Sequence, residues 1–600
     1  MALIDDFNAF IYDSKEKALT ISKTLSGLFS LCAVVLVIYE LGFPLSPAEE
    51  IWVIKGFSLI FGYFAFNYFL NLFYTFERVS FLKSSWFEGM IMLFIITSGI
   101  YDFYTNLHLF EQIFIRIGVE HSEQIYRVFM TLMILYFVGF NFVKASTLLN
   151  NLTLKPAITF ILSFVLLIAI GTGLLMLPQM TTIEGGADFM SAFFTSVSAS
   201  CVTGLIVQDT ATYFTLKGLL VIMFLMQLGG IGMVSFATFF ATFMKNGVGL
   251  KQQLIIQDYL ASESLFSAKG LLRQVIGITL TIEVIATVFI FFSWGAHVEF
   301  DSFSQRLFYS AFHGISAFCN AGFSLFSNGL YEEGIRNSYL LHIVIGFTII
   351  VGGLGFSAVQ DLFSPKALQE RLHRPWKDWK ISTKVAVHTS LLLIFVGMAL
   401  FFLTEHNGVM KNMGTFESIV SAFFQSVTTR TAGFNTVDFS QLAVPTLIFM
   451  VFLMFIGASS GSTGGGIKTS TFLLIANAAI ATIRGKKNVE LGKRSISTDL
   501  LGKAYSVFVF ACTFNLIMIF VLSITDPNLS IIHLVFEQVS AFATVGLSAG
   551  ITAKLSLAGK IVIISSMFIG RIGTLTLALA LSTRVSSNSF KYPSAHIMIG

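Results

Sequence analysis

Four short segments of this 600-residue chain carry a repeated pattern that could bind a cation. Each is a heptapeptide with glycine at its sixth position, and the four read ASCVTGL at 199–205, AFCNAGF at 317–323, TTRTAGF at 428–434 and AFATVGL at 541–547. The glycines are 118, 111 and 113 residues apart: Gly204, Gly322, Gly433 and Gly546. Repetition at such a regular period indicates one structural unit that is used four times.

The chemistry of these segments would come from the backbone. Glycine adopts positive φ readily, which allows successive carbonyl groups to turn in the same direction. Four such segments around an axis would form rings of oxygens that replace the water around a potassium ion. One glycine alone would be explained better by close helix packing, but four matched glycines favour a pore. The predicted ion-binding residues of this selectivity filter are Val202, Thr203, Gly204, Asn320, Ala321, Gly322, Thr431, Ala432, Gly433, Thr544, Val545 and Gly546.

The composition indicates what surrounds these segments. Hydrophobic residues make up 55% of the chain and charged residues only 12%, and the mean hydropathy is +0.80. Soluble domains carry about a quarter charged residues because their surface faces water. Most of the surface of this chain must therefore face lipid. The net charge of +4 is small and no basic patch interleaved with aromatics occurs, which argues against nucleic acid as a partner.

Apolar runs of two lengths organise the chain. A helix of about 20 residues can cross the hydrocarbon, whereas a run of about 10 to 14 residues is too short. Four long runs come first, near 24–43, 51–74, 87–104 and 126–143. A long run, a short run, a glycine-containing break and a second long run then follow four times. The short runs lie near 188–200, 305–317, 415–428 and 529–542, and the closing long runs near 215–244, 338–363, 444–482 and 558–584.

These runs predict an all-α polytopic membrane protein with twelve spanning helices and four half-length pore helices. Four extra helices precede four pseudo-symmetric repeats of membrane helix, pore helix and membrane helix around a central pore. The predicted regions are 1–150 for the extra helices and 151–250, 265–365, 380–485 and 495–590 for the repeats. Each pore helix would end at mid-membrane, where its carbonyl end favours a cation. Asp188 and Glu417, at the opposite ends of two pore helices, could be simple caps or could concentrate cations.

Basic residues are concentrated in the loops after the first three closing runs, near 245–273, 366–384 and 484–503. Under the positive-inside rule these loops are cytoplasmic, and the even number of leading helices places the N-terminus there as well. We therefore predict a multi-pass protein of the plasma membrane with both termini in the cytoplasm. The basic loops could dock a regulatory partner, or they could serve topology alone.

The third closing run is interrupted by a segment rich in Gly, Ser and Thr. Such residues disfavour a helix and leave polar backbone in the membrane, so the segment should face an aqueous path. A Lys or Arg at the bilayer centre costs about 2.5–3.5 kcal/mol, so Lys468 and Arg571 should face a wet cavity or a partner, or else reach the cytoplasm from helix ends. A positive side chain below the filter would oppose cation passage. The predicted gate residues are Gly457, Ser460, Gly461, Gly464, Gly465, Gly466, Lys468 and Arg571.

Residues 457–469, GASSGSTGGGIKT, and 570–578, GRIGTLTLA, together with the glycine segments, resemble the Ktr/Trk/HKT superfamily of potassium transporters. The likeness is greatest to the Ktr-type membrane subunit and extends over about 156–584. It implies potassium uptake, sodium-dependent or sodium-permeant in some relatives, through a filter with a mobile intramembrane gate. It also implies a homodimer regulated by a cytoplasmic nucleotide-binding ring. Relatives with Ser at the first filter position tend to select sodium, so Gly204 favours potassium. The N-terminal 150 residues depart from the family.

Two other classes of function compete with a channel-like uptake subunit. A tightly coupled secondary transporter would need ionisable residues inside spanning helices, and Glu283 is the main candidate, although we favour a helix–helix contact for it. An enzyme is disfavoured: the run 461–469 lacks the Gly–Lys pair of a phosphate loop. Residues 353–358, GLGFSA, match a dinucleotide fingerprint by letter but lie in an apolar run, where they indicate helix packing. We expect no tightly bound cofactor, potassium as the transported ion, and sodium as a candidate activator.

Overall fold

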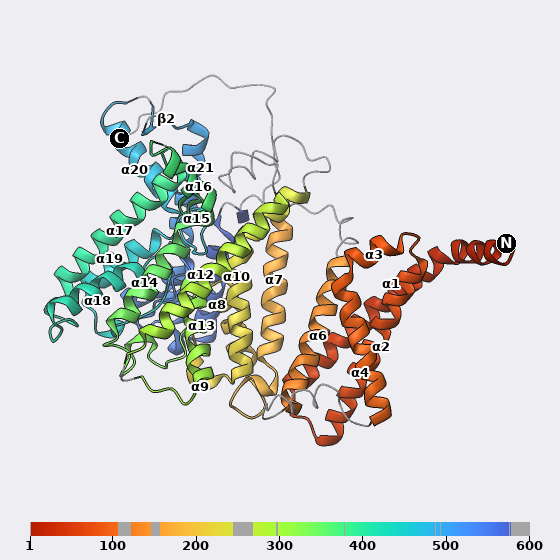
Figure 1. Ribbon diagram of the computed structural model, residues 1–600. Coiled ribbons are helices and arrows are strands. Elements are labelled where there is room, and N and C mark those ends of the chain that lie inside the picture. The colour runs from red at the N-terminus through yellow and green to blue at the C-terminus, as the bar shows by residue number, and fades with distance from the viewer. Residues whose placement is uncertain are drawn as a thin grey trace. The chain divides into compact units, whose positions relative to one another are not determined.

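The computed structural model describes residues 2–105, 122–145, 156–243, 268–295, 298–376, 378–486, 488–492, 494–574 and 576–577. The chain divides into two compact units, one formed by residues 1–154 and 177–179 and the other by the rest (Figure 1). The loop around 245–267, parts of the other basic loops and the chain beyond residue 577 lie outside the described residues.

The first unit is helical throughout its described residues. Its helices are α1 (Ala2–Gly42), α2 (Pro47–Tyr74), α3 (Arg78–Ser84), α4 (Trp86–Thr105) and α6 (Ser122–Ala145). Helix α2 begins with a capping box, in which the Ser46 and Glu49 side chains each bind the other residue's backbone N–H group. Phe57, Phe61 and Phe64 pack with Phe137 of α6 in the core of this unit. The helices therefore gather around one aromatic core.

The second unit contains the repeated pattern. The first repeat comprises α7 (Pro156–Leu175), α8 (Phe189–Ser200), α9 (Thr210–Tyr213) and α10 (Leu216–Phe243). The second repeat comprises α12 (Ala268–Ser293), α13 (Phe303–Cys319), α14 (Tyr339–Leu354), α15 (Phe356–Phe363) and α16 (Pro365–His373). The third comprises α17 (Ile381–Glu405), α18 (Thr415–Thr428), α19 (Val444–Phe455) and α20 (Thr469–Ile483), and the fourth α21 (Thr498–Thr525), α22 (Ile531–Phe542) and α23 (Leu557–Ile572). A small hairpin pairs β1 (Glu490–Leu491) antiparallel with β2 (Arg494–Ser495).

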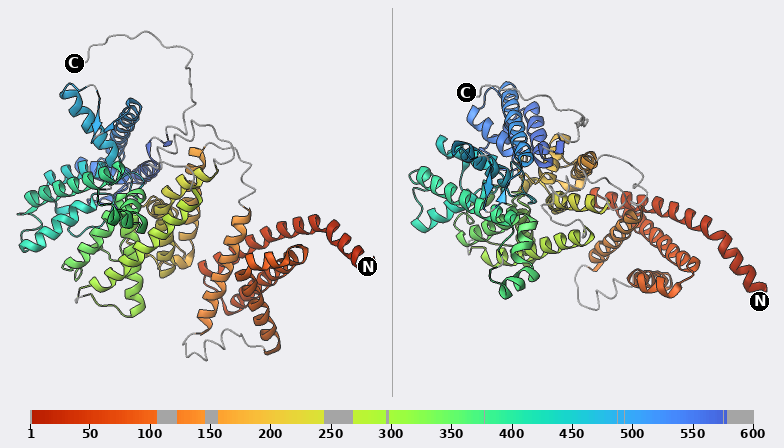
Figure 2. Two further views of the ribbon diagram at one scale, coloured as in Figure 1. Left: turned by 45° about the horizontal axis from the view of Figure 1, so that its top comes forward. Right: turned by 90° about the horizontal axis from the view of Figure 1, so that it is seen from above.

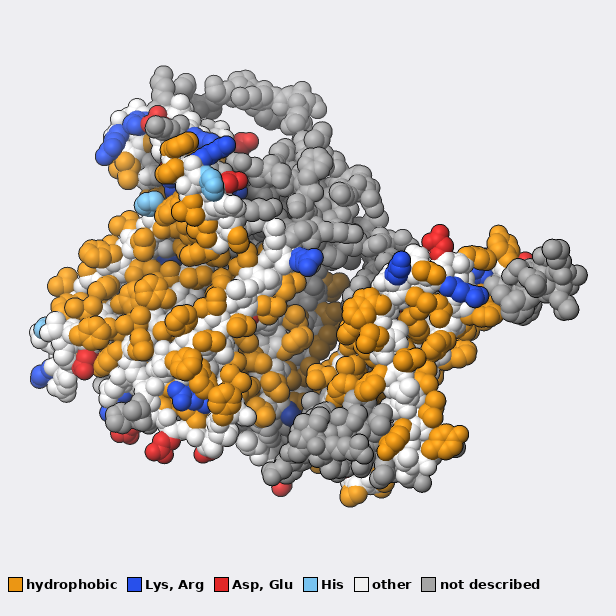
Figure 3. Space-filling model, in the orientation of Figure 1, with side chains coloured by type: hydrophobic (Ala, Val, Ile, Leu, Met, Phe, Trp, Pro, Cys, Tyr) orange, Lys and Arg blue, Asp and Glu red, His pale blue; other side chains and the backbone are white. Residues whose placement is uncertain are grey.

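The all-α polytopic fold predicted from the sequence is confirmed. Among the described residues, six helices are long and apolar enough to cross a membrane, or eight if each of two bent pairs is one span. Viewed from above, the gold, green, cyan and blue helices of the second unit follow one another around a common centre (Figure 2). Hydrophobic side chains cover the middle of the face of this unit in Figure 3, and charged side chains gather toward its two ends. That distribution suits a protein embedded in lipid.

Two closing runs are not the continuous helices that the sequence suggested. The run 338–363 breaks at Gly355, where φ is +90° and the helix axis turns by 107° between α14 and α15. The run is therefore not one continuous helix, although Gly353 does pack closely, since a methyl group on it would lie 3.5 Å from the Asn320 side chain. In the run 558–584, α23 ends at Ile572 and Gly573 adopts a φ of +86°. In both cases a glycine takes a left-handed conformation that ends a helix, which the apolar pattern alone did not reveal.

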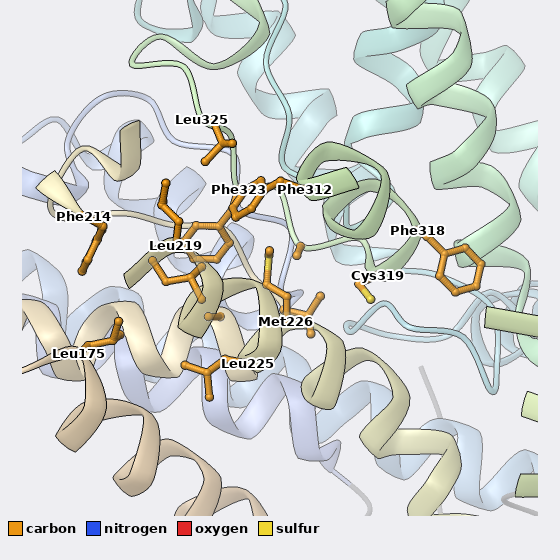
Figure 4. Packing of buried hydrophobic residues seen from close by; sticks show 14 of the residues in the cluster. Leu175, Phe214, Leu219, Leu225, Met226, Phe312, Phe318, Cys319, Phe323 and Leu325 are labelled. Carbon is orange, nitrogen blue, oxygen red and sulfur yellow. The ribbon is translucent and has the colours of Figure 1, made fainter. Parts of the chain in front are cut away.

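Neighbouring repeats share their cores. Leu219, Leu225 and Met226 of α10 pack in one cluster with Phe312 and Cys319 of α13, which belongs to the next repeat (Figure 4). Polar contacts fix each pore helix to the opening helix of its own repeat as well. The Ser196 hydroxyl donates to the carbonyl of Ile168 at 2.8 Å, and Ser426 donates to Ile394 at 2.7 Å. The pore helices are thus held from both sides.

In the third repeat and again in the fourth, a buried carboxylate links the end of the opening helix to the start of the closing helix. Asp526, at the end of α21, accepts hydrogen bonds from the Ser556 backbone N–H at 2.6 Å and the Ser556 hydroxyl at 3.1 Å. Glu405, at the end of α17, accepts the backbone N–H of Ala443 at 2.9 Å, just before α19 begins. Each acid therefore holds together the two long helices that flank the pore helix of its repeat.

We predict that Asp526→Ala lowers the stability of the protein in detergent. The substitution leaves the Ser556 N–H without its acceptor, which costs about 1–3 kcal/mol. The midpoint of thermal unfolding should fall measurably relative to Asp499→Ala, which removes an exposed acid from the first turn of α21. Equal midpoints for the two variants would show that the carboxylate does not hold the helix ends together.

Candidate ion-conducting site

The four predicted glycines lie in a closed ring. A methyl group built on each of them would collide with the carbonyl oxygen of the residue that precedes the glycine in the next segment. The pairs are Gly204 with Ala321, Gly322 with Ala432, Gly433 with Val545, and Gly546 with Thr203. The segments therefore meet in chain order around one axis, and the last contacts the first. Only glycine fits where four backbones approach so closely.

The backbone of each segment alternates in handedness. The filter glycines have φ between +71° and +93°, and the residue two positions earlier also has positive φ: 56° at Val202, 58° at Asn320, 65° at Thr431 and 50° at Thr544. The sequence analysis assigned this conformation to the glycines alone. A left-handed conformation costs a residue with a side chain about 1–2 kcal/mol, and three of these four are β-branched. The surrounding packing must impose this strain.

Each pore helix orients the filter backbone through one hydroxyl residue near its end. Ser198 and Ser540 accept the N–H groups of Gly204 and Gly546 on their hydroxyls, at 3.1 and 3.2 Å. The backbone carbonyls of the same two serines accept the N–H groups of the residues before those glycines, both at 2.8 Å. The N–H groups therefore point to the pore helix, which leaves the opposite carbonyls for the axis.

In the other two repeats, the hydroxyl of the pore helix donates a hydrogen bond to the filter segment instead of accepting one. The Ser316 hydroxyl donates to the carbonyl of Phe323 at 2.8 Å, and the Thr428 hydroxyl donates to the carbonyl of Phe434 at 2.6 Å. Sequence reasoning missed these supporting residues. The signal was present, since a serine stands six positions before the filter glycine in three of the four repeats.

A second set of buried side chains holds the chain after the filter glycine. Glu537 of α22 accepts the hydroxyl of Ser548, and it also accepts the hydroxyl of Thr552 at 3.1 Å. In the second repeat the equivalent residue, His313, contacts the Ser324 hydroxyl at 3.1 Å. Both side chains are fully buried. They position the outgoing strand, and the sequence analysis did not identify either of them.

The ring is rich in oxygen atoms that lack donors. Among the described residues, none of the carbonyls of Thr203, Ala321, Ala432 and Val545 accepts a hydrogen bond. The side-chain oxygens of Thr203 and Thr544 are also buried without a hydrogen-bond partner there. Buried polar groups are nearly always paired, so a cluster of unpaired acceptors needs a cation or water to satisfy it. This donor set suits a monovalent alkali ion.

The two acids at the far ends of the pore helices act as caps. Asp188 accepts the backbone N–H of Ser191 at 3.1 Å, and Glu417 accepts the backbone N–H of Gly414 at 2.8 Å. Their contacts with the first turns of α8 and α18 are those expected of N-terminal caps. The capping interpretation is therefore confirmed.

The Gly-rich segment forms a non-helical loop between α19 and α20, directly beside the ring. A methyl group on Gly464 would strike Thr431, and one on Gly465 would strike Thr544, both of which are filter residues. Gly457 is equally close to the carbonyl of Gly465, and Gly466 approaches Ala543. Residues 464–466 therefore pack against the filter with no space for side chains.

Ser460 and Gly461, also predicted gate residues, do not approach the ring. Both are exposed, and the Ser460 hydroxyl contacts that of Ser470 at 2.8 Å. The carbonyl of Gly461 instead accepts the N–H of Phe356, on the far side of the Gly355 break, at 3.0 Å. The loop thus has one face on the filter and one on the second repeat.

Three basic side chains converge on this loop. Arg571 is 1% exposed and donates to the carbonyl of Thr463 and, at 2.5 Å, to that of Gly229 in α10. Lys468 folds back onto the carbonyl of Gly464 at 2.5 Å. The interpretation of Arg571 as a helix-end residue that reaches the cytoplasm is therefore wrong, because its guanidinium is buried against the loop.

Arg430, which lies within the third filter segment, is the basic side chain that the sequence analysis missed. Its guanidinium donates to Ser390 at 3.2 Å and to the carbonyl of Gly457 at 3.4 Å. The side chain is 7% exposed. Arg430 thus places a positive charge at the start of the loop, and Arg571 and Lys468 place two more further along it.

Glu283 is a helix contact, as the sequence analysis favoured. Its carboxylate accepts the Gln227 side-chain N–H at 3.0 Å, and this bond links α12 to α10. The carboxylate is buried and also lies near the Cys319 thiol at the end of α13. A contact of this kind accounts for the residue without a role in ion coupling.

Many apolar helices around a buried ring of backbone oxygens define an all-α polytopic membrane protein built for ions. A family model described as TrkH, cation transport protein, matches residues 121–592. The chain belongs to this family, and the resemblance inferred from its motifs is confirmed.

Individual relatives agree with this assignment. The chain is 37% identical to Ktr system potassium uptake protein B of Bacillus subtilis (strain 168), over 73% of this chain and 95% of that protein. It is 36% identical to potassium/sodium uptake protein NtpJ of Enterococcus hirae, over 74% and 98% of the two chains. The crystal structure of the potassium transporter TrkH from Vibrio parahaemolyticus has a similar fold, with a TM-score of 0.58 and 18% identity over 76% of this chain and 91% of that one.

We predict that Gly322→Ala abolishes ion conduction while the protein still folds. The methyl group would lie 2.7 Å from the carbonyl oxygen of Ala432, inside the ring. Rubidium flux into liposomes should fall at least about tenfold, equivalent to about 1.4 kcal/mol. The matched control is Gly185→Ala, because Gly185 has a similar positive φ, +92°, with open space around it. Normal flux through the Gly322 variant would contradict the ring.

Proposed function

We propose that this protein takes up potassium across the plasma membrane by channel-like passage through the four-segment ring. The observation that carries the proposal is the closed ring of backbone carbonyls without hydrogen-bond donors. Such oxygens can replace the water around a bare alkali ion. The names of the potassium uptake relatives support the choice of ion, and so does glycine at all four filter positions.

The Gly-rich loop acts as the gate of this pathway. Gly464 and Gly465 lie against filter residues of the third and fourth repeats, so the loop stands where an ion would leave the ring. The charges of Arg571, Lys468 and Arg430 oppose a cation there. Conduction then requires the loop to move away from the ring, together with at least part of this positive charge.

The basic loops face the cytoplasm, and both termini lie on that side. The protein acts as a homodimer, and a cytoplasmic nucleotide-binding ring docks on the basic loop around the β1–β2 hairpin and controls the gate. The exposed residues Arg484, Lys486 and Arg494 around the β1–β2 hairpin form part of this docking face. No cofactor is bound tightly, and sodium acts as an activator.

Flux measurements test the proposed function. Purified protein in liposomes should take up rubidium down its gradient without a proton gradient, and potassium should compete more strongly than sodium. As an activator, sodium should raise the rate. The rival class is a coupled transporter that uses Glu283, and a fixed stoichiometry of rubidium with protons or sodium would favour it.

We predict that Arg571→Ala raises basal rubidium flux several-fold in liposomes that lack any partner. The substitution removes a buried charge and its bonds to Thr463 and Gly229, so the loop loses both an anchor and an electrostatic barrier. Arg306→Ala is the control, because Arg306 also donates to a backbone carbonyl, that of Phe291 at 2.7 Å, but lies far from the loop in sequence and contact. Unchanged or lower flux in the Arg571 variant would remove the gating role.

A second prediction concerns the docking face. Replacement of Arg484, Lys486 and Arg494 by Gln should weaken binding of the regulatory ring and reduce the response of flux to nucleotide. Replacement of Lys554 and Lys560, beside the start of α23, should have no such effect. An intact nucleotide response in the first variant would leave topology as the only role of these charges.

A further inference from the structure

The second helix after the Gly355 break, α16, presents apolar side chains to its surroundings. In and just after α16, Leu368 is 45% exposed, Leu372 81% and Trp376 79%, at intervals of four residues. Four-residue spacing places Leu368 and Leu372 on one side of a helix. Phe363, at the end of α15, is 58% exposed as well. An apolar side this exposed needs a hydrophobic environment.

Basic and aromatic residues accompany this apolar side. His373, Arg374 and Lys380 are exposed, while Arg371 is paired with Asp361 of α15. Trp376 and Trp379 stand within the same few residues, and tryptophan is enriched at the boundary between lipid and water. Figure 1 places α15 and α16 at the same end of the second unit as β2. A helix with one apolar side and adjacent bases has the features of an interfacial helix.

We propose that α16 lies in the headgroup layer of the membrane, with Leu368, Leu372 and Trp376 in the acyl boundary and its bases on anionic phospholipid. The 107° turn after α14 supports this placement, because it directs the chain away from the axis of a spanning helix. The positive charges of Arg374 and Lys380 complement lipid phosphates. We name this helix the lipid tether.

The lipid tether connects to the gate through α15. The N–H of Ser459 donates to the carbonyl of Gly353, and the N–H of Phe356 donates to the carbonyl of Gly461, both at 3.0 Å. These two bonds cross the Gly355 break and hold the outer face of the loop. At the other end of α15, the Asp361 carboxylate binds Arg371 at 2.9 Å.

The same carboxylate also accepts the backbone N–H of Lys380, just before α17, at 3.1 Å. A change in the position of α16 would therefore move α15 and, with it, the loop. This second part of the inference rests on the proposed gating function, whereas the placement of α16 in lipid does not.

The placement is tested by spin labels on the full-length protein in vesicles of phosphatidylcholine with or without phosphatidylglycerol. Cys32 and Cys512 are first replaced by Ser, and the buried Cys201 and Cys319 are retained. A nitroxide at Leu372→Cys should be relaxed more by oxygen than by a water-soluble nickel complex. A nitroxide at Glu370→Cys, on the opposite side of the helix, should show the reverse. Equal access of the nickel complex to both labels would overturn the proposal, as would protection of the Leu372 label only after a protein partner is added.

The connection to the gate is tested by flux. Leu372→Gln combined with Trp376→Gln should change basal rubidium flux at least about twofold in vesicles with phosphatidylglycerol, whereas Glu370→Gln should not. A label buried in lipid together with unchanged flux in the double variant would overturn the connection to the gate and retain the tether. Absence of rubidium flux in every variant and in the parent protein would contradict the proposed function instead, without affecting the result of the spin labels.

Discussion

The close approach of four backbone segments to one axis is the constraint on which this structure depends. Each filter glycine stands where a methyl group would strike a carbonyl of the next segment. The residue two positions earlier carries a side chain in a left-handed conformation that it would otherwise avoid. Such strain persists only where the surroundings over-determine it. The pore helices, their buried hydroxyls and the interlocked cores of neighbouring repeats provide those surroundings.

The same constraint explains the interrupted helix of the third repeat. A helix carries side chains that could not fit against the filter, whereas the glycines at 464–466 can. A loop in the membrane must have its polar groups satisfied by the protein. Arg571, Lys468 and Arg430 bind its carbonyls, and the broken second repeat binds its outer face. The proposed gate is therefore held by positive charges that would also repel a cation.

The contacts also explain how influence from outside the pore could reach the loop. Gly355 interrupts a closing helix, and the two hydrogen bonds across that break bind the loop rather than another turn of helix. The first repeat differs, since α10 is continuous from Leu216 to Phe243. Pseudo-symmetry thus holds at the ring and fails beneath it, where α10 is continuous, α14 and α23 end at a glycine, and a loop separates α19 from α20.

Much of the architecture could be predicted from the sequence, because run length, glycine spacing and the fourfold period are properties of the chain itself. They predicted the short helices, the four glycine segments that meet in a ring and the non-helical loop. The partners of Arg571, the role of Arg430, the serines behind the filter and the break at Gly355 came only from the tertiary structure. A hydrogen bond between residues more than 100 positions apart, such as Arg571 to Thr463, leaves no local pattern. The sequence by itself determined which backbone could line a pore, and tertiary packing decided which side chains hold that backbone in place, since contact between distant residues exists only once the chain has folded.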